Sequence, residues 1–221
     1  MVQQKFLRNI NFVASWFISI FALMTPERIK RLTDVLEKRQ PALTIVLENV
    51  TDPHNISAVM RTADAVGVQE IFILNTKIGL HEKWSSKSSS SAAKWLTIHQ
   101  YTDAVTCFAA LRQRYQKIFT THLSSDAASL YNLNLTERVA LVFGNEHSGV
   151  SEELIALADG NFIIPQVGII KSLNISVACA ISLYEAYRQK SIALHYSGQQ
   201  LSADQFAKLQ MKWGITDSKS P

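Results

Sequence analysis

The sequence predicts an α/β protein in which helices flank a mostly parallel β-sheet. Short apolar runs, typical of strands, alternate along the chain with longer segments that have helical periodicity. Between residues 43 and 74, a strand, a helix and a second strand follow one another within about 30 residues. This is the length of a βαβ unit, and hence of a parallel strand pair. Short helical extensions are expected on either side of this domain.

The composition indicates one globular domain with a sizeable core. Of the 221 residues, 47% are hydrophobic and 18% are charged, which excludes disorder beyond short tails. The formal charge of +4 allows a polyanionic partner without requiring one. Cys107 and Cys179 lie far apart among apolar residues, and no Cys/His cluster has zinc spacing. We therefore expect buried free thiols, a reducing compartment and no metal.

Residues 1–24 differ from the rest of the chain. Lys5 and Arg8 precede an apolar run from Ile10 to Met24. The run suits a signal peptide or a short membrane anchor, but it is short for a full span and no small-x-small cleavage site follows it. A third interpretation, which we favour, is that translation begins at Met24. We therefore expect a cytoplasmic protein, with membrane association possible only through residues 1–24.

Beyond that segment, the expected domain covers residues 25–193. Its first helix is predicted from Glu27 to Arg39, with Thr25 as the N-cap and Pro26 in the first turn. A narrow apolar stripe contains Ile29, Leu32, Val35 and Leu36. The basic residues lie away from this stripe, and a solvated face explains them as well as a nucleic-acid contact does: Arg28, Arg31, Lys38 and Arg39.

The βαβ unit follows. Leu43–Glu48 is a predicted strand, Asp52 is suited to cap the next helix, and Gly67 is suited to end it. The second strand is expected at Glu70–Leu74. The buried face of the helix is predicted to consist of Ile56, Val59, Met60, Ala63 and Val66.

A serine- and lysine-rich loop from Asn75 to Lys94 comes next, and it is either a mobile surface loop or a site for phosphate groups. Short strands are predicted at 95–98, 117–121 and 139–143. A helix at 103–115 is expected to point Val105, Phe108, Ala109 and Leu111 inward. The longest helix, at 174–190, is apolar on most sides and must be largely buried, either in this domain or at a subunit contact. A modest helix at 201–213 belongs to a C-terminal extension at 194–221, which ends in a frayed tail.

Three breaks in the chain stand beside apolar runs. They occur at Gly144-Asn145-Glu146, at Pro165 and at Lys171-Ser172-Leu173-Asn174. Polar groups on loops held by a rigid core are the usual components of a site. The common dinucleotide, phosphoryl-transfer and acyl-transfer fingerprints are absent from the sequence.

Three motifs carry a resemblance to a known family. They are Asn55–Ala63 (NISAVMRTA), Leu141–Val150 (LVFGNEHSGV) and Ile163–Ala178 (IIPQVGIIKSLNISVA). In this order and spacing they resemble the SpoU branch of the SPOUT RNA 2′-O-methyltransferases, over about Pro26 to Ala193. The likeness is greatest to members that methylate guanosine 18 of tRNA.

This resemblance implies a C-terminal deep trefoil knot, a homodimer, a tRNA partner and the cofactor S-adenosyl-L-methionine. It implies catalytic roles for Arg61, Asn55, Glu146, Ser172 and Asn174. Arg61 would clamp a phosphate and orient the acceptor hydroxyl, Asn55 would orient the arginine or the substrate, and Glu146 would hold a loop or the arginine. Read without the resemblance, Ser172 is a helix N-cap and Asn174 a helix-start residue; both readings can hold together.

The residues that match the family's cofactor positions are Thr121, Gly144, Ile164 and Leu173. Ordinary core packing also explains Ile164 and Leu173. Glu48, at the end of the first strand, is a weaker candidate than these, and a plain strand-end charge explains it equally well. The chain departs from the family in its short C-terminal extension and its hydrophobic N-terminus.

The leading hypothesis is methylation of a guanosine 2′-hydroxyl in tRNA, at position 18 in the D-loop. The alternatives are the same chemistry on ribosomal RNA or at another tRNA position, and an RNA-binding protein that does not methylate.

Overall fold

A computed structural model describes residues 24–81 and 92–215. Its centre is a seven-stranded sheet in the order β3-β2-β1-β6-β4-β7-β5, in which every strand pairing is parallel. The strands are β1 (Gln40–Glu48), β2 (Val68–Leu74), β3 (Thr97–Tyr101), β4 (Lys117–Thr121), β5 (Ala128–Ser129), β6 (Val139–Phe143) and β7 (Gly160–Ile163). The helices are α2 (Pro26–Glu37), α3 (Pro53–Ala65), α4 (Ala92–Trp95), α5 (Ala104–Arg112), α6 (Glu152–Leu157), α7 (Ile175–Ile192) and α8 (Ala203–Trp213), with a 3₁₀ turn at Leu130–Asn132.

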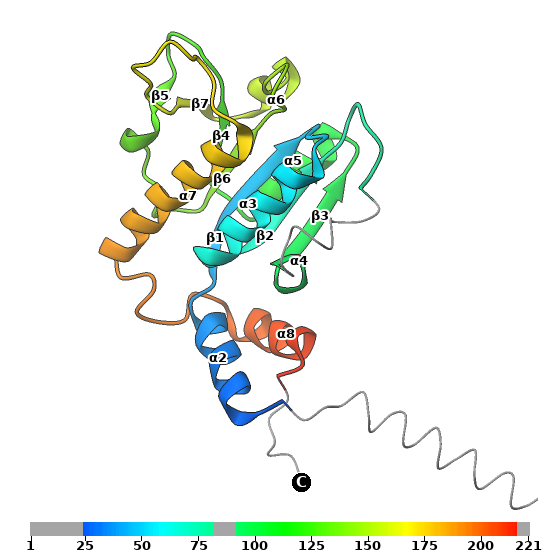
Figure 1. The fold of residues 1–221 in the computed structure, drawn as a ribbon, viewed down its shortest axis with the longest axis vertical. Helices are drawn as coiled ribbons and strands as arrows, with labels where there is room; N and C mark the ends of the chain where they lie inside the picture. The colour runs from blue at the N-terminus through cyan, green and yellow to red at the C-terminus, as the bar shows by residue number, and fades with distance from the viewer. Residues whose placement is uncertain (1–23, 82–91, 216–221) are drawn as a thin grey trace, which may run out of the picture.

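Helices cover both faces of the sheet, as expected for a parallel sheet (Figure 1). Neighbouring residues of β1 point to opposite sides. Ile45 and Leu47 join the core beneath α3 and α7, whereas Val46 joins the core beneath α5 and α6. The predicted α/β class and parallel sheet are therefore confirmed.

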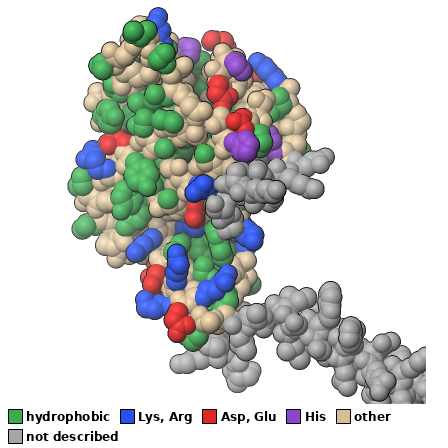
Figure 2. Space-filling view, viewed as in Figure 1, with side chains coloured by type: hydrophobic (Ala, Val, Ile, Leu, Met, Phe, Trp, Pro, Cys, Tyr) green, Lys and Arg blue, Asp and Glu red, His purple; other side chains and the backbone are tan. Residues whose placement is uncertain are grey.

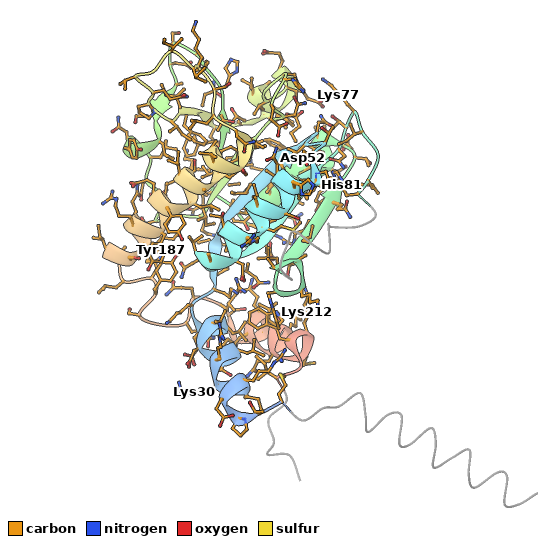
Figure 3. The ribbon with its side chains drawn as sticks, in the orientation of Figure 1. Lys30, Asp52, Lys77, His81, Tyr187 and Lys212 are labelled. Carbon is orange, nitrogen blue, oxygen red and sulfur yellow. The ribbon has the colours of Figure 1, made fainter. Side chains whose placement is uncertain are left out.

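Helix α3 forms as its sequence predicts. The Asp52 carboxylate accepts the His54 amide at 2.8 Å, and Gly67 adopts a left-handed φ of 81° just after the helix. All five residues of the predicted buried face are buried. The helix runs beside α7, and Figure 3 marks Asp52 at the end where α3 begins.

Helices α2 and α8 pack against each other at one end of the molecule (Figure 1). Arg39, which the sequence left to solvent or nucleic acid, is fully buried between them and the domain. Its guanidinium donates to Asp64 at 2.6 Å and to the Val68 carbonyl at 3.1 Å, and it stacks over Trp213 at 5.0 Å. The Lys212 ammonium donates to the Leu96 carbonyl at 2.8 Å and adds a second link between α8 and the domain (Figure 3).

Two further predictions, for α5 and β3, are wrong in detail. Val105 is 62% exposed and Ala109 is also exposed, because α5 buries the face at Ala104, Cys107, Phe108 and Leu111. Trp95 ends the short helix α4 and packs edge-on against Trp213, so β3 begins two residues later at Thr97.

Both cysteines are buried free thiols, as predicted. Among residues 24–81 and 92–215, the structure contains no helix that is long and apolar enough to cross a membrane. The proposals for residues 1–23, for the serine-rich stretch at 82–91 and for the tail at 216–221 fall outside the described residues.

Candidate functional site

A hollow lies at the sheet edge where β4, β6 and β7 end. It consists of two adjoining parts of about 350 and 410 Å³, which share Thr121, Gly149, Ser172, Leu173 and Ala178. We call the two parts together the edge hollow. Parallel strands present their carboxyl ends at one edge, where open α/β sheets usually bind ligands.

The four predicted cofactor residues all line the edge hollow. Thr121 and Leu173 border both parts, Ile164 borders the first part and Gly144 the second. The Thr121 hydroxyl donates to the Val142 carbonyl at 3.2 Å, so its side chain is fixed to the neighbouring strand. The structure brings these residues together, and their roles toward a cofactor stay predictions.

Gly144 is required by the fold of its own loop. A Cβ at this position would lie 1.9 Å from the carbonyl carbon and oxygen of Gly149, which is far inside van der Waals contact. The turn is closed by the Gly149 amide, which donates to the Asn145 carbonyl at 3.0 Å. The Asn145 side chain accepts two further backbone amides at 2.9 Å. Residues 144–150 therefore form a tightly folded loop beside the hollow.

Three of the predicted catalytic residues form a cluster next to this loop. The Asn55 amide donates to the Glu146 carboxylate, and its oxygen accepts from the Asn174 amide at 3.2 Å. These residues come from the first turn of α3, the loop after β6 and the start of α7. The cluster therefore ties together the three motif segments that the sequence singled out.

The start of α7 corrects one prediction. Asn174, not Ser172, is the N-cap, and its side-chain oxygen accepts the Ser176 amide at 2.9 Å and the Ser176 hydroxyl at 2.6 Å. The helix begins two residues later than a Ser172 cap requires. Ser172 lies in the preceding loop and lines both parts of the edge hollow, with its side chain exposed.

Arg61 lies apart from this cluster in the single chain. It is six residues after Asn55 on α3, which places it roughly 9 Å further along the helix axis and about 120° around it. Its side chain is exposed and lines a different hollow, together with Ala58, Thr62, Ala65 and Tyr184. The Asn55 amide is bonded to Glu146 and Asn174 and not to this arginine.

Three residues that were given no role from the sequence also line the hollow: His122, Gln166 and Lys171. The Gln166 amide donates to the Lys171 carbonyl at 3.4 Å and so closes the loop between the second and third breaks. The signals that could have found them are the place of Gln166 and Lys171 within the third motif and the position of His122 beside Thr121. In the part of the chain that the structure describes, no group of three or more His, Cys, Asp or Glu residues could hold a metal ion.

The chemistry of the hollow fits S-adenosyl-L-methionine. Ile164, Leu173 and Phe162 form an apolar lining that suits an adenine ring, while the 144–149 turn and Ser172 add polar groups to the same hollow. A nucleoside with a charged amino-acid tail needs both kinds of surface.

Comparison with known proteins identifies the family. The model of the SpoU rRNA methylase family matches residues 42–184. This chain belongs to the SpoU methylase family. The tRNA (guanosine(18)-2'-O)-methyltransferase of Thermus thermophilus is 40% identical over 189 residues, which cover 86% of this chain and 96% of that enzyme. The resemblance drawn from the three motifs is thereby confirmed.

Solved structures of the SpoU family have the same fold. The A. aeolicus TrmH/SpoU tRNA modifying enzyme superposes with a TM-score of 0.79 at 36% identity, covering 88% of this chain and 98% of that one. The AdoMet-bound rRNA methyltransferase of Sinorhizobium meliloti superposes with a TM-score of 0.60 at 25% identity, covering 71% and 59%.

Proposed function

We propose that this SpoU-family chain transfers the methyl group of S-adenosyl-L-methionine to the 2′-hydroxyl of a guanosine in tRNA, at position 18 in the D-loop. The observation that carries the proposal is the Asn55–Glu146–Asn174 cluster at the border of the edge hollow. A member of the family that is named for this activity matches 86% of this chain and 96% of its own length. The ribosomal-RNA enzyme of Sinorhizobium is matched over only part of its length.

The residues divide into a cofactor side and an acceptor side. When bound, the cofactor supplies a methyl group on a positively charged sulfur, which is ready for in-line displacement. Thr121, Gly144, Ile164 and Leu173 hold it and exclude water. The Asn55–Glu146–Asn174 cluster fixes the loop next to it, so the approach of the hydroxyl is set before reaction.

Arg61 belongs to the acceptor side. Its guanidinium clamps a backbone phosphate with two parallel hydrogen bonds and orients the ribose hydroxyl. A guanidinium stays protonated in proteins, so Arg61 contributes charge and position. As the C–O bond forms and the C–S bond of the cofactor breaks, the proton of the 2′-hydroxyl leaves to a phosphate oxygen or to solvent. Ser172 lines the hollow and contacts the ribose or the cofactor.

We also propose that the working form is a homodimer that pairs through α7. Hydrophobic side chains gather on the side of the molecule where α7 lies (Figure 2). Val177, Tyr184 and Tyr187 on α7 are between 42% and 54% exposed, and Val167 and Ile169 beside the edge hollow are almost fully exposed. An apolar surface of this kind marks a contact site. Arg61 borders it at Tyr184, so a second copy brings an acceptor-side arginine toward a hollow.

We further propose that the backbone between β7 and α7 forms a deep trefoil knot. The loops after β4, β6 and β7 all line one hollow, and α7 begins directly beside them, which supports a threaded path. A crystal structure traced through residues 160–192 decides the question, and an unthreaded path contradicts the proposal.

A cytoplasmic location accords with the two free buried thiols. We expect a protein begun at Met24 to fold and to be active. Recovery of the full chain in a membrane fraction would instead identify residues 1–24 as an anchor.

The decisive experiment is methyl transfer from radiolabelled cofactor to unmodified tRNA transcripts, followed by mapping of the labelled nucleotide. A matched transcript with 2′-deoxyguanosine at position 18 lacks the acceptor oxygen and is expected to take up no label. Label at another tRNA position, or in ribosomal RNA only, reassigns the substrate. RNA binding without any methyl transfer would indicate a non-catalytic RNA-binding protein.

A further inference from the structure

Glu48 is an acidic side chain with almost no access to water. It is the last residue of β1, an interior strand that pairs with β2 on one side and with β6 on the other. Its side chain is 2% exposed. A carboxylate buried to this extent destabilises the fold unless hydrogen bonds replace its lost hydration.

The hydrogen bond that it makes reaches across the sequence. A Glu48 carboxylate oxygen accepts the backbone amide of Ser151 at 2.9 Å, from a residue 103 positions away. Ser151 is the N-cap of α6 and follows directly after the folded loop 144–150. Glu48 therefore holds the point at which this loop ends and α6 begins.

The other end of the same loop is held by the sheet. Phe143 pairs with Leu47, the neighbour of Glu48, and Gly144 then packs against Gly149. Both ends of loop 144–150 are thus fixed to the last two residues of β1, one by strand pairing and one by the Glu48 side chain. Six consecutive residues of the loop, 144–149, line the edge hollow.

We infer that Glu48 is a positioning residue that holds loop 144–150 in the shape that binds the cofactor. It touches neither cofactor nor substrate and acts through the Ser151 amide. The inference rests on the proposed function, because it assigns the edge hollow to the cofactor. It also explains why this strand ends in a buried charge, which strand-end solvation does not.

Four variants isolate the hydrogen bond. Glu48→Ala removes the acceptor. Glu48→Gln keeps an acceptor oxygen on a side chain of the same length. Ser151→Pro removes the donor, because Ser151 has φ −69° and proline adopts this value without strain. Ser151→Ala is the matched control, since it loses the hydroxyl cap and keeps the amide.

We expect Glu48→Ala and Ser151→Pro each to weaken S-adenosyl-L-methionine binding roughly tenfold, as loss of one buried charge-assisted hydrogen bond does. Glu48→Gln and Ser151→Ala are expected within about threefold of the parent protein. The double variant Glu48→Ala/Ser151→Pro should bind no more weakly than either single variant, because both remove one interaction. Calorimetric titration compares the parent protein with these variants, and the RNA affinity is expected to change little.

Amide hydrogen exchange provides a readout that does not depend on the cofactor. The Ser151 amide is expected to be protected in the parent protein and in Glu48→Gln, and to exchange much faster in Glu48→Ala. If the parent protein binds no cofactor, the proposed function fails. The exchange result still tests whether Glu48 holds the Ser151 amide. Unchanged cofactor affinity in Glu48→Ala, additive losses in the double variant, or equal Ser151 exchange in all proteins would overturn the inference.

Discussion

At the scale of single residues, Arg61 is the residue that we propose to act on the acceptor side of the reaction. Its exposed guanidinium stands on α3 beside Tyr184, away from the hollow and from the Asn55–Glu146–Asn174 cluster. This position supports the proposed role of Arg61 toward the RNA, not the cofactor.

We therefore expect Arg61→Ala to lower the rate of methyl transfer about a hundredfold or more, because the acceptor hydroxyl loses its orientation. Cofactor affinity is expected to stay nearly intact. Arg61→Lys is the matched variant: it keeps the charge and loses the planar fork, so it should recover RNA affinity better than rate. Single-turnover kinetics and cofactor titration make the comparison. A large loss of cofactor affinity in Arg61→Ala would contradict the assignment.

Single residues also show where sequence reasoning stops. Ser172 and Asn174 are equally good N-cap residue types, and only the path of the backbone decides that Asn174 caps α7. Arg39 looked like a surface charge because its partners Asp64 and Trp213 are distant in sequence. The Asn55–Glu146–Asn174 contacts were approached only through the family resemblance, since no local pattern links three residues on separate segments.

At the scale of elements, helix α7 has faces with different neighbours. Ile175, Cys179 and Leu183 point into the core beneath the sheet, while Val177 and Tyr184 are exposed. Its last turns bury a lysine. Lys190 is fully buried and donates to the Thr136 carbonyl at 3.2 Å.

This lysine gives the protein a specific pH dependence. Burial, with a smaller contribution from Arg138, lowers the pKa of Lys190 from 10.5 to about 8. Between pH 8 and 10.5 the unfolded chain therefore binds more protons at this site than the folded chain, so the free energy of unfolding rises with pH in this window.

Between about pH 7 and 10.5, we expect the free energy of unfolding of the parent protein to rise by up to about 3 kcal/mol relative to that of Lys190→Met. Urea unfolding at several pH values measures the difference. Lys208→Met, at an exposed position on α8, is the control. Its free energy of unfolding should change with pH in the same way as that of the parent protein. If the free energies of unfolding of the parent protein and Lys190→Met differ by the same amount across this pH range, the lysine is not held in a desolvated state.

The elements themselves were largely predictable, whereas their arrangement was not. The longer strands β1, β2, β4 and β6 are recognisable from their apolar runs, and β3 begins later than its run suggests. The sheet order, with β6 between β1 and β4, depends on contacts that no local pattern encodes. The inward face of α5 was only half predicted: Phe108 and Leu111 are buried, whereas Val105 and Ala109 are exposed. Apolar or small residues occupy most positions of this helix, so periodicity hardly distinguishes one face from another.

At the scale of the whole molecule, the exposed side of α7 predicts the oligomeric state. We expect the parent protein to be a dimer and Val177→Asp to be a monomer with strongly reduced methyl transfer, because a charge in an apolar contact stays without a partner. Val105→Asp is the matched control: Val105 is 62% exposed on α5, and its replacement should leave the dimer intact. Light scattering after gel filtration measures the mass. A monomeric, fully active parent protein would refute the pairing through α7.

The contact between α2 and α8 also has a consequence for synthesis. Within the described chain, α2 is the first helix to leave the ribosome and α8 the last, yet they share one small core with Leu36, Leu201 and Trp213. Met24 and Gly214 lie so close that a Cβ on the glycine would sit 3.6 Å from the methionine methyl group. The nascent domain must therefore keep the apolar side of α2 uncovered until translation has passed Trp213, and Arg39 gains its stacking partner only then.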